Sequence, residues 1–105
     1  MDKNKLLQQG FTHFSHNEFE QAAALFEQAL EIDPSFDLAC NALAESYNRM
    51  GRLEDAIHTA KKLVELNPDD PMAHTALSRL YVQKGLIREA EEEMALSNIL
   101  AQKNS

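Results

Sequence analysis

The chain has 105 residues, 44% of them hydrophobic and 26% charged, with three glycines and three prolines. This composition is typical of one small ordered domain and leaves no room for a second, catalytic domain. Ten Lys and Arg against 17 Asp and Glu give a formal net charge of −7, so the chain repels nucleic-acid phosphates and acidic membrane surfaces, and neither is expected as a partner. The single cysteine, and the lack of an apolar stretch long enough for a signal peptide or a membrane span, predict a cytoplasmic location.

Apolar residues recur at helical spacing along the chain, as in Ile57, Ala60, Leu63 and Val64, and strand-like alternation is not sustained. The pattern predicts an all-α protein with six helices. In chain order, the predicted helices cover residues 2–15, 18–32, 36–49, 52–66, 70–83 and 86–102.

Residues that favour helix ends lie between these segments. Gly51 and Gly85 can adopt the left-handed conformation that ends a helix, and Asp70 can cap the fifth helix ahead of a proline. Asn17, three residues before Glu20, predicts a capping box at the start of the second helix. The boundaries of all six helices are therefore predicted to within a few residues.

The sequence also repeats with a period of 34 residues. A shift by one period aligns Ala22 with Ala56 and Ala90, Ala39 with Ala73, Leu43 with Leu77, Pro34 with Pro68, Tyr47 with Tyr81, and Gly51 with Gly85. Three such units account for nearly the whole chain, and each unit contains one predicted pair of helices.

The repeated residues resemble the tetratricopeptide repeat, whose pattern runs from an aromatic residue through Leu-Gly, Tyr, Ala and a second aromatic residue to a closing Pro. The first unit matches at Gly10, Ala22, Phe26, Ala29 and Pro34, and the second at Leu43, Ala44, Tyr47, Gly51, Ala56, Ile57 and Pro68. The departures are Leu6, Cys40 and His74 at the opening aromatic position, His13 at the tyrosine and Gln102 at the closing proline. The resemblance implies an all-α fold, a right-handed α-α superhelix, or solenoid, of three tetratricopeptide helix pairs. It makes residues 1–105 a single domain with repeat units at about 3–36, 37–70 and 71–104.

The faces expected at the two ends of the array are polar. They read Lys5, Gln8 and Gln9 in the first helix, and Glu91 and Asn98 in the last. Terminal units of a solenoid need such faces to remain soluble, so we expect a complete array of three units.

Leu96 and Ile99 interrupt the polar surface of the last helix, and two interpretations are open. In the first interpretation, they form a self-association patch in a symmetric homodimer. Alternatively, the last helix bends or frays and tucks both side chains against the third unit, which is the simpler interpretation because single apolar surface residues are common.

The resemblance implies a non-enzymatic protein–protein interaction module, a scaffold or adaptor that binds a peptide or partner helix in a concave groove. The inward positions are Leu7, Phe11 and Phe14, then Leu38, Asn41, Glu45, Asn48 and Arg49, then Met72, Thr75, Arg79 and Gln83. The phenylalanines either accept an apolar side chain or simply pack on the second helix. The arginines either hold a carboxylate or pair with acids such as Glu45. The partner is an unidentified protein or peptide. The alternative is a structural protein that acts through homo-oligomerisation of its C-terminal helix.

One ligand class of the family can be tested on the sequence. Co-chaperones of this family hold the C-terminal carboxylate of heat-shock chaperones with Lys, Asn, Asn, Lys and Arg side chains. The matching positions hold Leu7, Phe11, Ala42, Met72 and Ala76. None of these can donate a side-chain hydrogen bond, so a clamp of that kind is not expected. Arg79, one turn further on, can still meet an acid in a different pose.

Two pairs of residues invite a chemical interpretation. His13 and His16 have a spacing that can place two imidazoles on one metal, but no third ligand lies nearby, so a partly buried core histidine is expected. Cys40 and His74 occupy the same repeat position in adjacent units, which suggests a nucleophile–base pair. Both replace a buried aromatic residue, however, and this favours a core role. We therefore expect no enzymatic activity, no cofactor and no metal.

Overall fold

The computed structural model describes residues 2–104, and no strand lies within that range. Its six helices are α1 (Lys3–Ser15), α2 (Phe19–Ile32), α3 (Asp37–Arg49), α4 (Leu53–Leu66), α5 (Pro71–Lys84) and α6 (Ile87–Lys103). Both ends of every helix lie within one residue of the prediction. The six predicted helices are therefore confirmed.

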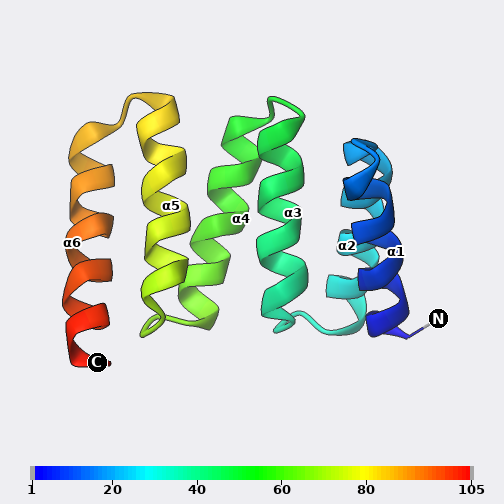
Figure 1. Cartoon of the computed structure of the whole chain (residues 1–105), viewed down its shortest axis with the longest axis horizontal. Coiled ribbons are helices and arrows are strands. Elements are labelled where there is room, and N and C mark those ends of the chain that lie inside the picture. Colours follow the sequence, from blue (N-terminus) through cyan, green and yellow to red (C-terminus); the bar gives the residue numbers. More distant parts are fainter. Residues whose placement is uncertain (1, 105) are drawn as a thin grey trace.

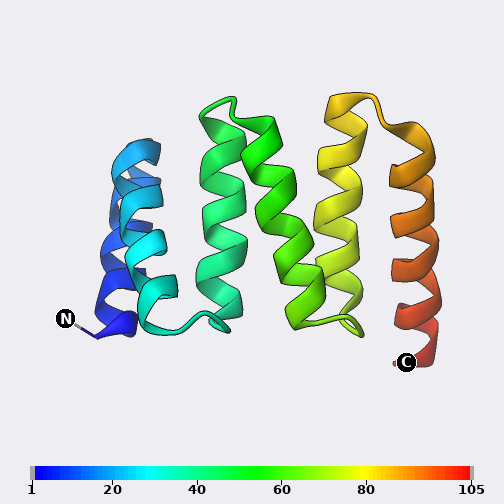
Figure 2. The same ribbon diagram turned by 180° about the vertical axis from the view of Figure 1, so that it is seen from behind.

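The helices stand side by side in chain order, from α1 at one end of the array to α6 at the other (Figure 1). Each helix packs on the next one along the chain, and the view from behind shows the same order (Figure 2). The array measures 39 × 28 × 20 Å. This arrangement confirms an all-α solenoid of three helix pairs.

Small residues allow the helices to approach closely. Ala22, Ala29, Ala56 and Ala60 are fully buried, and the fully buried ring of Phe26 fills the space left between α1 and α2. The core continues from one pair to the next. Residues Ala22, Ala23 and Phe26 of α2 pack on Ala42 and Leu43 of α3, and Ala56, Ile57 and Ala60 of α4 pack on Leu77 and Leu80 of α5. One hydrophobic core thus fixes the three pairs relative to one another.

One buried contact between the helices of a pair changes its chemistry from unit to unit. In the first pair Leu6 packs with Leu25. In the second pair the Cys40 thiol donates to the backbone carbonyl of Thr59 at 3.4 Å. In the third pair the His74 ring lies 3.3 Å from the Glu93 carboxylate and 2.8 Å from the Pro68 carbonyl. These three residues depart from the aromatic pattern, and each has its own partner on the second helix.

The helix ends confirm most of the predicted signals and correct one. Gly51 and Gly85 have φ angles of 79° and 86°, and the Asp70 carboxylate accepts from the backbone N–H of Met72. The capping box predicted at Asn17 is wrong. Asn17 has a φ of 62°, so it occupies the left-handed position after α1, and the N-cap of α2 is Glu18, which makes no side-chain capping bond. Asparagine tolerates this conformation because its short polar side chain can bond locally.

Candidate functional site

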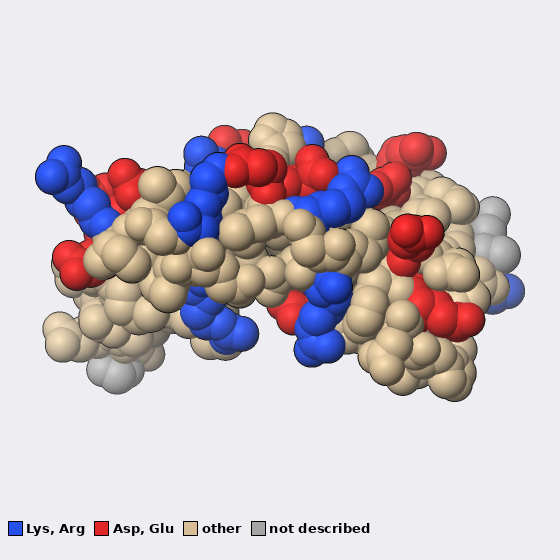
Figure 3. All heavy atoms as spheres, turned by 90° about the horizontal axis from the view of Figure 1, so that it is seen from above, with Lys and Arg blue, Asp and Glu red and all other residues tan. Residues whose placement is uncertain are grey.

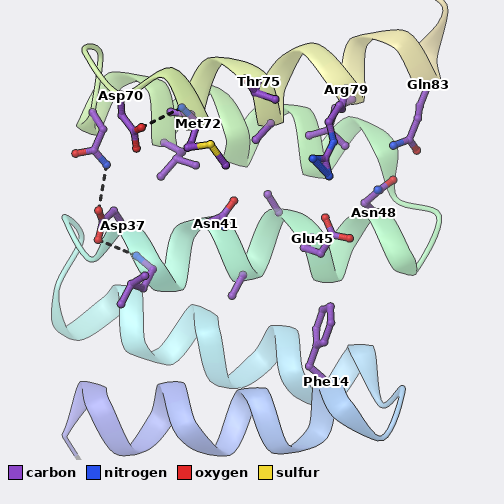
Figure 4. Close-up of a pocket in the computed structure, with 18 of the residues that line it drawn as sticks. Phe14, Asp37, Asn41, Glu45, Asn48, Asp70, Met72, Thr75, Arg79 and Gln83 are labelled. Atoms are coloured by element: carbon purple, nitrogen blue, oxygen red, sulfur yellow. Dashed lines mark hydrogen bonds between the residues drawn. The ribbon is translucent and has the colours of Figure 1, made fainter. Parts of the chain in front are cut away.

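A groove with a volume of about 530 Å³ runs over the first helices of the three pairs. Along one wall, Asp37, Asn41, Glu45 and Asn48 follow each other on α3, and along the other wall Met72, Thr75, Arg79 and Gln83 follow each other on α5 (Figure 4). Phe14 of α1 lies at one end. The helical periodicity of these residues places them all on the side of the array that faces the groove.

Ten of the twelve predicted groove residues line it. They are Phe11, Phe14, Leu38, Asn41, Glu45, Asn48, Met72, Thr75, Arg79 and Gln83. Leu7 and Arg49 do not. Leu7 packs against the core that joins the first two pairs. The guanidinium carbon of Arg49 lies 5.6 Å from the ring centres of both Phe14 and Phe19. Its Nε lies 3.2 Å from the Glu45 carboxylate. Arg49 is thus occupied by Glu45 and the two rings, and of the two predicted groove arginines only Arg79 lines the groove.

The apolar groove residues differ in how firmly they are packed. Phe11 is 46% exposed although its ring meets Phe26 edge-on at 5.3 Å. Phe14 is half-buried against Phe19 at 5.0 Å. Both rings therefore pack on α2 and still line the groove, which combines the two interpretations offered by the sequence. Leu38 and Met72 are 59% and 70% exposed, so they present the most open apolar surface of the groove.

Several polar groove side chains have no partner within the described part of the chain. Arg79 is exposed and its side chain forms no hydrogen bond or ion pair there. The side-chain amides of Asn41, Asn48 and Gln83 also form none, and Asn48 is the one of these three that is partly buried. Thr75 differs, because its hydroxyl is bonded to the Ser97 hydroxyl at 2.7 Å. The unpartnered groups offer donors and acceptors for a peptide backbone and one cation for a carboxylate.

Three polar residues at the opposite end of the groove from Arg79 were missed by the sequence prediction. Asp37 and Asp70 lie where α3 and α5 begin, and Asn67 donates to the Asp37 carboxylate at 3.3 Å. The sequence identifies Asp70 only as a helix cap, and its carboxylate does cap α5 by accepting from the Met72 N–H at 2.9 Å. The signal that was available is their place in the repeat, since all three residues border the turns that lead into α3 and α5. The groove therefore has two carboxylates at one end and an unpaired guanidinium further along.

Surface charge outside the groove is mixed. On the face seen in Figure 3, Lys and Arg side chains stand apart from one another among acidic ones, and no continuous basic patch is visible on that face. No helix in the described range is both long and apolar enough to cross a bilayer.

Of the residues considered for catalysis or metal binding, His13, Cys40 and His74 have structural partners, and His16 is exposed. The His13 ring lies 2.9 Å from the Glu18 carboxylate, and in residues 2–104 no group of three or more His, Cys, Asp or Glu side chains is arranged to hold a metal ion. Cys40 is buried, and burial raises the pKa of its thiol to about 11. Because Cys40 bonds to Thr59 while His74 faces Glu93, the two do not form a nucleophile–base pair.

The last helix contradicts the simpler interpretation of its apolar residues. It continues as a helix to Lys103, and Leu96 and Ile99 are 44% and 56% exposed. The expectation that both side chains tuck against the third pair is therefore wrong.

Comparison with known proteins agrees with the repeat pattern and the fold. The tetratricopeptide repeat family matches residues 13–80, more than half of the chain. The Dictyostelium discoideum "Protein STIP1 homolog" is 32% identical over 84 residues, which are 80% of this chain and only 15% of that relative. The crystal structure of MamA superposes with a TM-score of 0.93 at 21% identity, covering 98% of this chain and 60% of that one. The Yersinia enterocolitica type III secretion chaperone SycD, solved in complex with a peptide of the translocator YopD, gives a TM-score of 0.87 at 22% identity over 92% of this chain and 74% of that one. With the sequence match and the fold in agreement, the chain belongs to the tetratricopeptide repeat family.

Proposed function

We propose that the chain is a non-enzymatic interaction module that binds an extended segment of a partner protein in the groove over α1, α3 and α5. The observation that carries this proposal is the gathering of unpartnered groups in one place. The side chains of Arg79, Asn41 and Asn48 form no hydrogen bond or ion pair within the described range, and they lie in the same groove as the exposed side chains of Leu38 and Met72. A bound segment would bury the apolar surface and satisfy the polar groups at the same time.

Relatives support a role in binding peptides. The SycD chaperone, which shares this fold, was solved with a bound peptide of the translocator YopD. The match to the STIP1 homolog is closer in sequence, but the chain spans about 15% of the length of that relative. The proposal therefore concerns the groove and the chemistry of its ligand, and the partner protein itself is unidentified.

The groove favours a ligand with an acidic side chain near an apolar one. Arg79 supplies the unpaired charge, and Met72 lies seven residues earlier on the same helix. Seven residues of helix span about 10 Å, which about three residues of an extended chain also cover. We expect an apolar residue over Met72 and Leu38 and a carboxylate about three positions away, at Arg79.

The opposite end of the groove adds a second, weaker preference. The carboxylates of Asp37 and Asp70 favour a cation on the ligand beyond its apolar residue. Part of their charge is offset by the partial positive charge at the helix N-termini where both residues lie. Arg79 is therefore expected to dominate the choice of ligand.

Selection from a random displayed peptide library tests the proposal. Wild-type chain should enrich peptides with Asp or Glu near an apolar residue, and Arg79→Glu should enrich Lys or Arg at the same position. Arg88→Glu makes the same change of charge at an exposed position of α6 outside the groove, and it should leave the selected sequences unchanged. No enrichment by the wild type, or the same peptides from wild type and Arg79→Glu, would contradict a ligand held at Arg79.

Two further parts of the proposal rest on the sequence. The single, unpaired cysteine, Cys40, supports a cytoplasmic location, because intramolecular disulfides are typical of oxidising compartments. The recurrence of the pattern every 34 residues supports one domain with repeat units at about 3–36, 37–70 and 71–104.

A further inference from the structure

The outer face of α6 carries an apolar pair that the equivalent helices lack. Leu96 and Ile99 are 44% and 56% exposed. The equivalent positions are polar and exposed in the other two pairs, with Gln28 and Glu31 in α2 and Lys62 and Glu65 in α4. Among the described residues α6 is the last element, and no helix covers this face (Figure 1).

Two opposite charges flank the apolar pair on the same face. Glu92 precedes Leu96 by four residues and Lys103 follows Ile99 by four, while Leu96 and Ile99 are three apart. Alternating steps of four and three residues keep side chains on one face of a helix, as in the seam of a coiled coil. Glu92 and Lys103 are both exposed, and neither forms a hydrogen bond or ion pair within residues 2–104.

The order of these four residues is self-complementary. The midpoint between Leu96 and Ile99 is also the midpoint between Glu92 and Lys103, in the middle of the face. A two-fold axis through that point places two copies of α6 antiparallel, with apolar residues facing each other and opposite charges at both ends. A parallel arrangement would instead place Glu92 against Glu92 and Lys103 against Lys103.

We infer that the outer face of α6 binds the same face of a second copy of the chain in a symmetric, antiparallel dimer. Leu96 packs against Ile99 of the second copy, and Glu92 pairs with Lys103 of the second copy. The contact uses none of the groove residues, so this inference goes beyond the proposed function and does not depend on it. One helix face is smaller than the roughly 800 Å² per partner of stable complexes, so the dimer is weak and forms at high protein concentration.

Sedimentation equilibrium over a concentration series up to the millimolar range tests the apolar contact. The wild type should shift from monomer to dimer as the concentration rises, and Leu96→Glu/Ile99→Glu should remain monomeric. Val82→Glu/Ile87→Glu is the matched control, because both residues are exposed but lie off this face, and it should dimerise like the wild type. A wild type that is monomeric throughout, or a dimer that persists in Leu96→Glu/Ile99→Glu, overturns the inference.

Charge reversal tests the antiparallel register. Glu92→Lys or Lys103→Glu alone places like charges opposite each other and should weaken dimerisation several-fold. The double variant Glu92→Lys/Lys103→Glu restores opposite charges and should recover the wild-type affinity. Circular dichroism confirms that each variant is folded. Single reversals without effect, or a double variant as weak as the singles, overturn the antiparallel pairing.

Discussion

Gly10 of α1 lies directly against the fully buried ring of Phe26 on α2. A Cβ at this position would come within 2.8 Å of the Cδ1 atom of that ring, closer than atoms in van der Waals contact. The ring cannot move away easily because it fills the core of the first pair. The small residue at this position of the repeat is thus required by the neighbouring helix, although alanine is the better helix former.

We expect Gly10→Ala to destabilise the chain by about 1–2 kcal/mol, since overpacking outweighs the gain in helix propensity. Urea unfolding monitored by circular dichroism measures the change. In a Phe26→Leu background the same substitution should cost less, because the shorter side chain leaves room. If Gly10→Ala is as stable as the wild type or more stable, the close approach of Phe26 to this position does not require a glycine.

Asp33 is a second residue with a well-defined local role. Its carboxylate accepts from the Lys3 ammonium of α1 at 2.5 Å and from the backbone and hydroxyl of Ser35. The bond from Lys3, followed by those from Ser35, lowers the pKa of Asp33 from 3.8 to about 2. The residue therefore ties the start of α1 to the turn between the first and second pairs.

The lowered pKa gives a pH dependence with a definite sign. The ionised Asp33 stabilises the folded chain fully above its unfolded pKa of 3.8, and this contribution is lost as the pH falls through the folded value of about 2. We expect Asp33→Asn to be less stable than the wild type at neutral pH, with the difference shrinking as the pH falls from about 4 to about 2. Asp69→Asn, at an exposed aspartate without a partner in the described residues, should show no such convergence. Urea unfolding midpoints of the wild type and both variants, measured across this pH range, test this prediction. A difference between Asp33→Asn and the wild type that does not change with pH would contradict it.

At the scale of the helix, the boundaries were predicted well because two independent signals agree. Apolar periodicity marks the helix interiors, and Gly51, Gly85 and Asp70 mark the ends. Asn17 shows where this reasoning failed. The capping-box spacing to Glu20 is present in the sequence, but repeat alignment pairs Asn17 with Gly51 and Gly85, and that position needs a left-handed residue. The repeat period was the stronger signal.

The helix pairs differ most in the contact that joins His74 to Glu93. Both side chains are largely buried, with 7% and 15% of their side-chain surface exposed, and the equivalent contact in the first pair joins Leu6 to Leu25. The sequence predicted the core position of His74 but not its partner, since partners across a pair depend on how the two helices are rotated against each other.

We expect His74→Leu to cost about 1–3 kcal/mol, because it leaves the Glu93 carboxylate without its partner in a largely buried site. The double variant His74→Leu/Glu93→Leu reproduces the chemistry of the first pair and should be more stable than His74→Leu alone. The Pro68 carbonyl loses the His74 ring in both variants, so this loss cancels when the two are compared. A double-mutant cycle by urea unfolding measures the coupling, and strictly additive costs would contradict it.

At the scale of the whole molecule, the groove is built from three helices that are distant in sequence and brought together by the repeat. Because the family resemblance implies which helix positions face inward, and the repeat carries those positions from unit to unit, most groove residues could be predicted from the sequence. Leu7 and Arg49 do not line the groove, because they lie at the edge of the inward face, where packing against Phe14 and the core decides the direction of the side chain. Asp37 and Asp70 were missed because they lie at the helix starts, where the sequence suggested a capping role for Asp70 and no role for Asp37.

The whole array also separates two surfaces. The groove lies over α1, α3 and α5, whereas the apolar pair Leu96 and Ile99 lies on the outer face of α6 and lines no part of the groove. A dimer formed through α6 would present two grooves in one particle. Such a particle would hold two ligand segments of one partner more tightly than a single chain, since the second binding step becomes intramolecular.

Binding in the groove over α1, α3 and α5 is best tested by a nuclear magnetic resonance titration of the isotope-labelled chain with the peptide that the wild type enriches. Backbone and side-chain signals of Asn41, Thr75 and Arg79 should shift in a saturable way, and Arg79→Glu should abolish the shifts while Arg88→Glu retains them. Shifts confined to α2, α4 and α6, with the groove signals unchanged, would contradict binding over α1, α3 and α5.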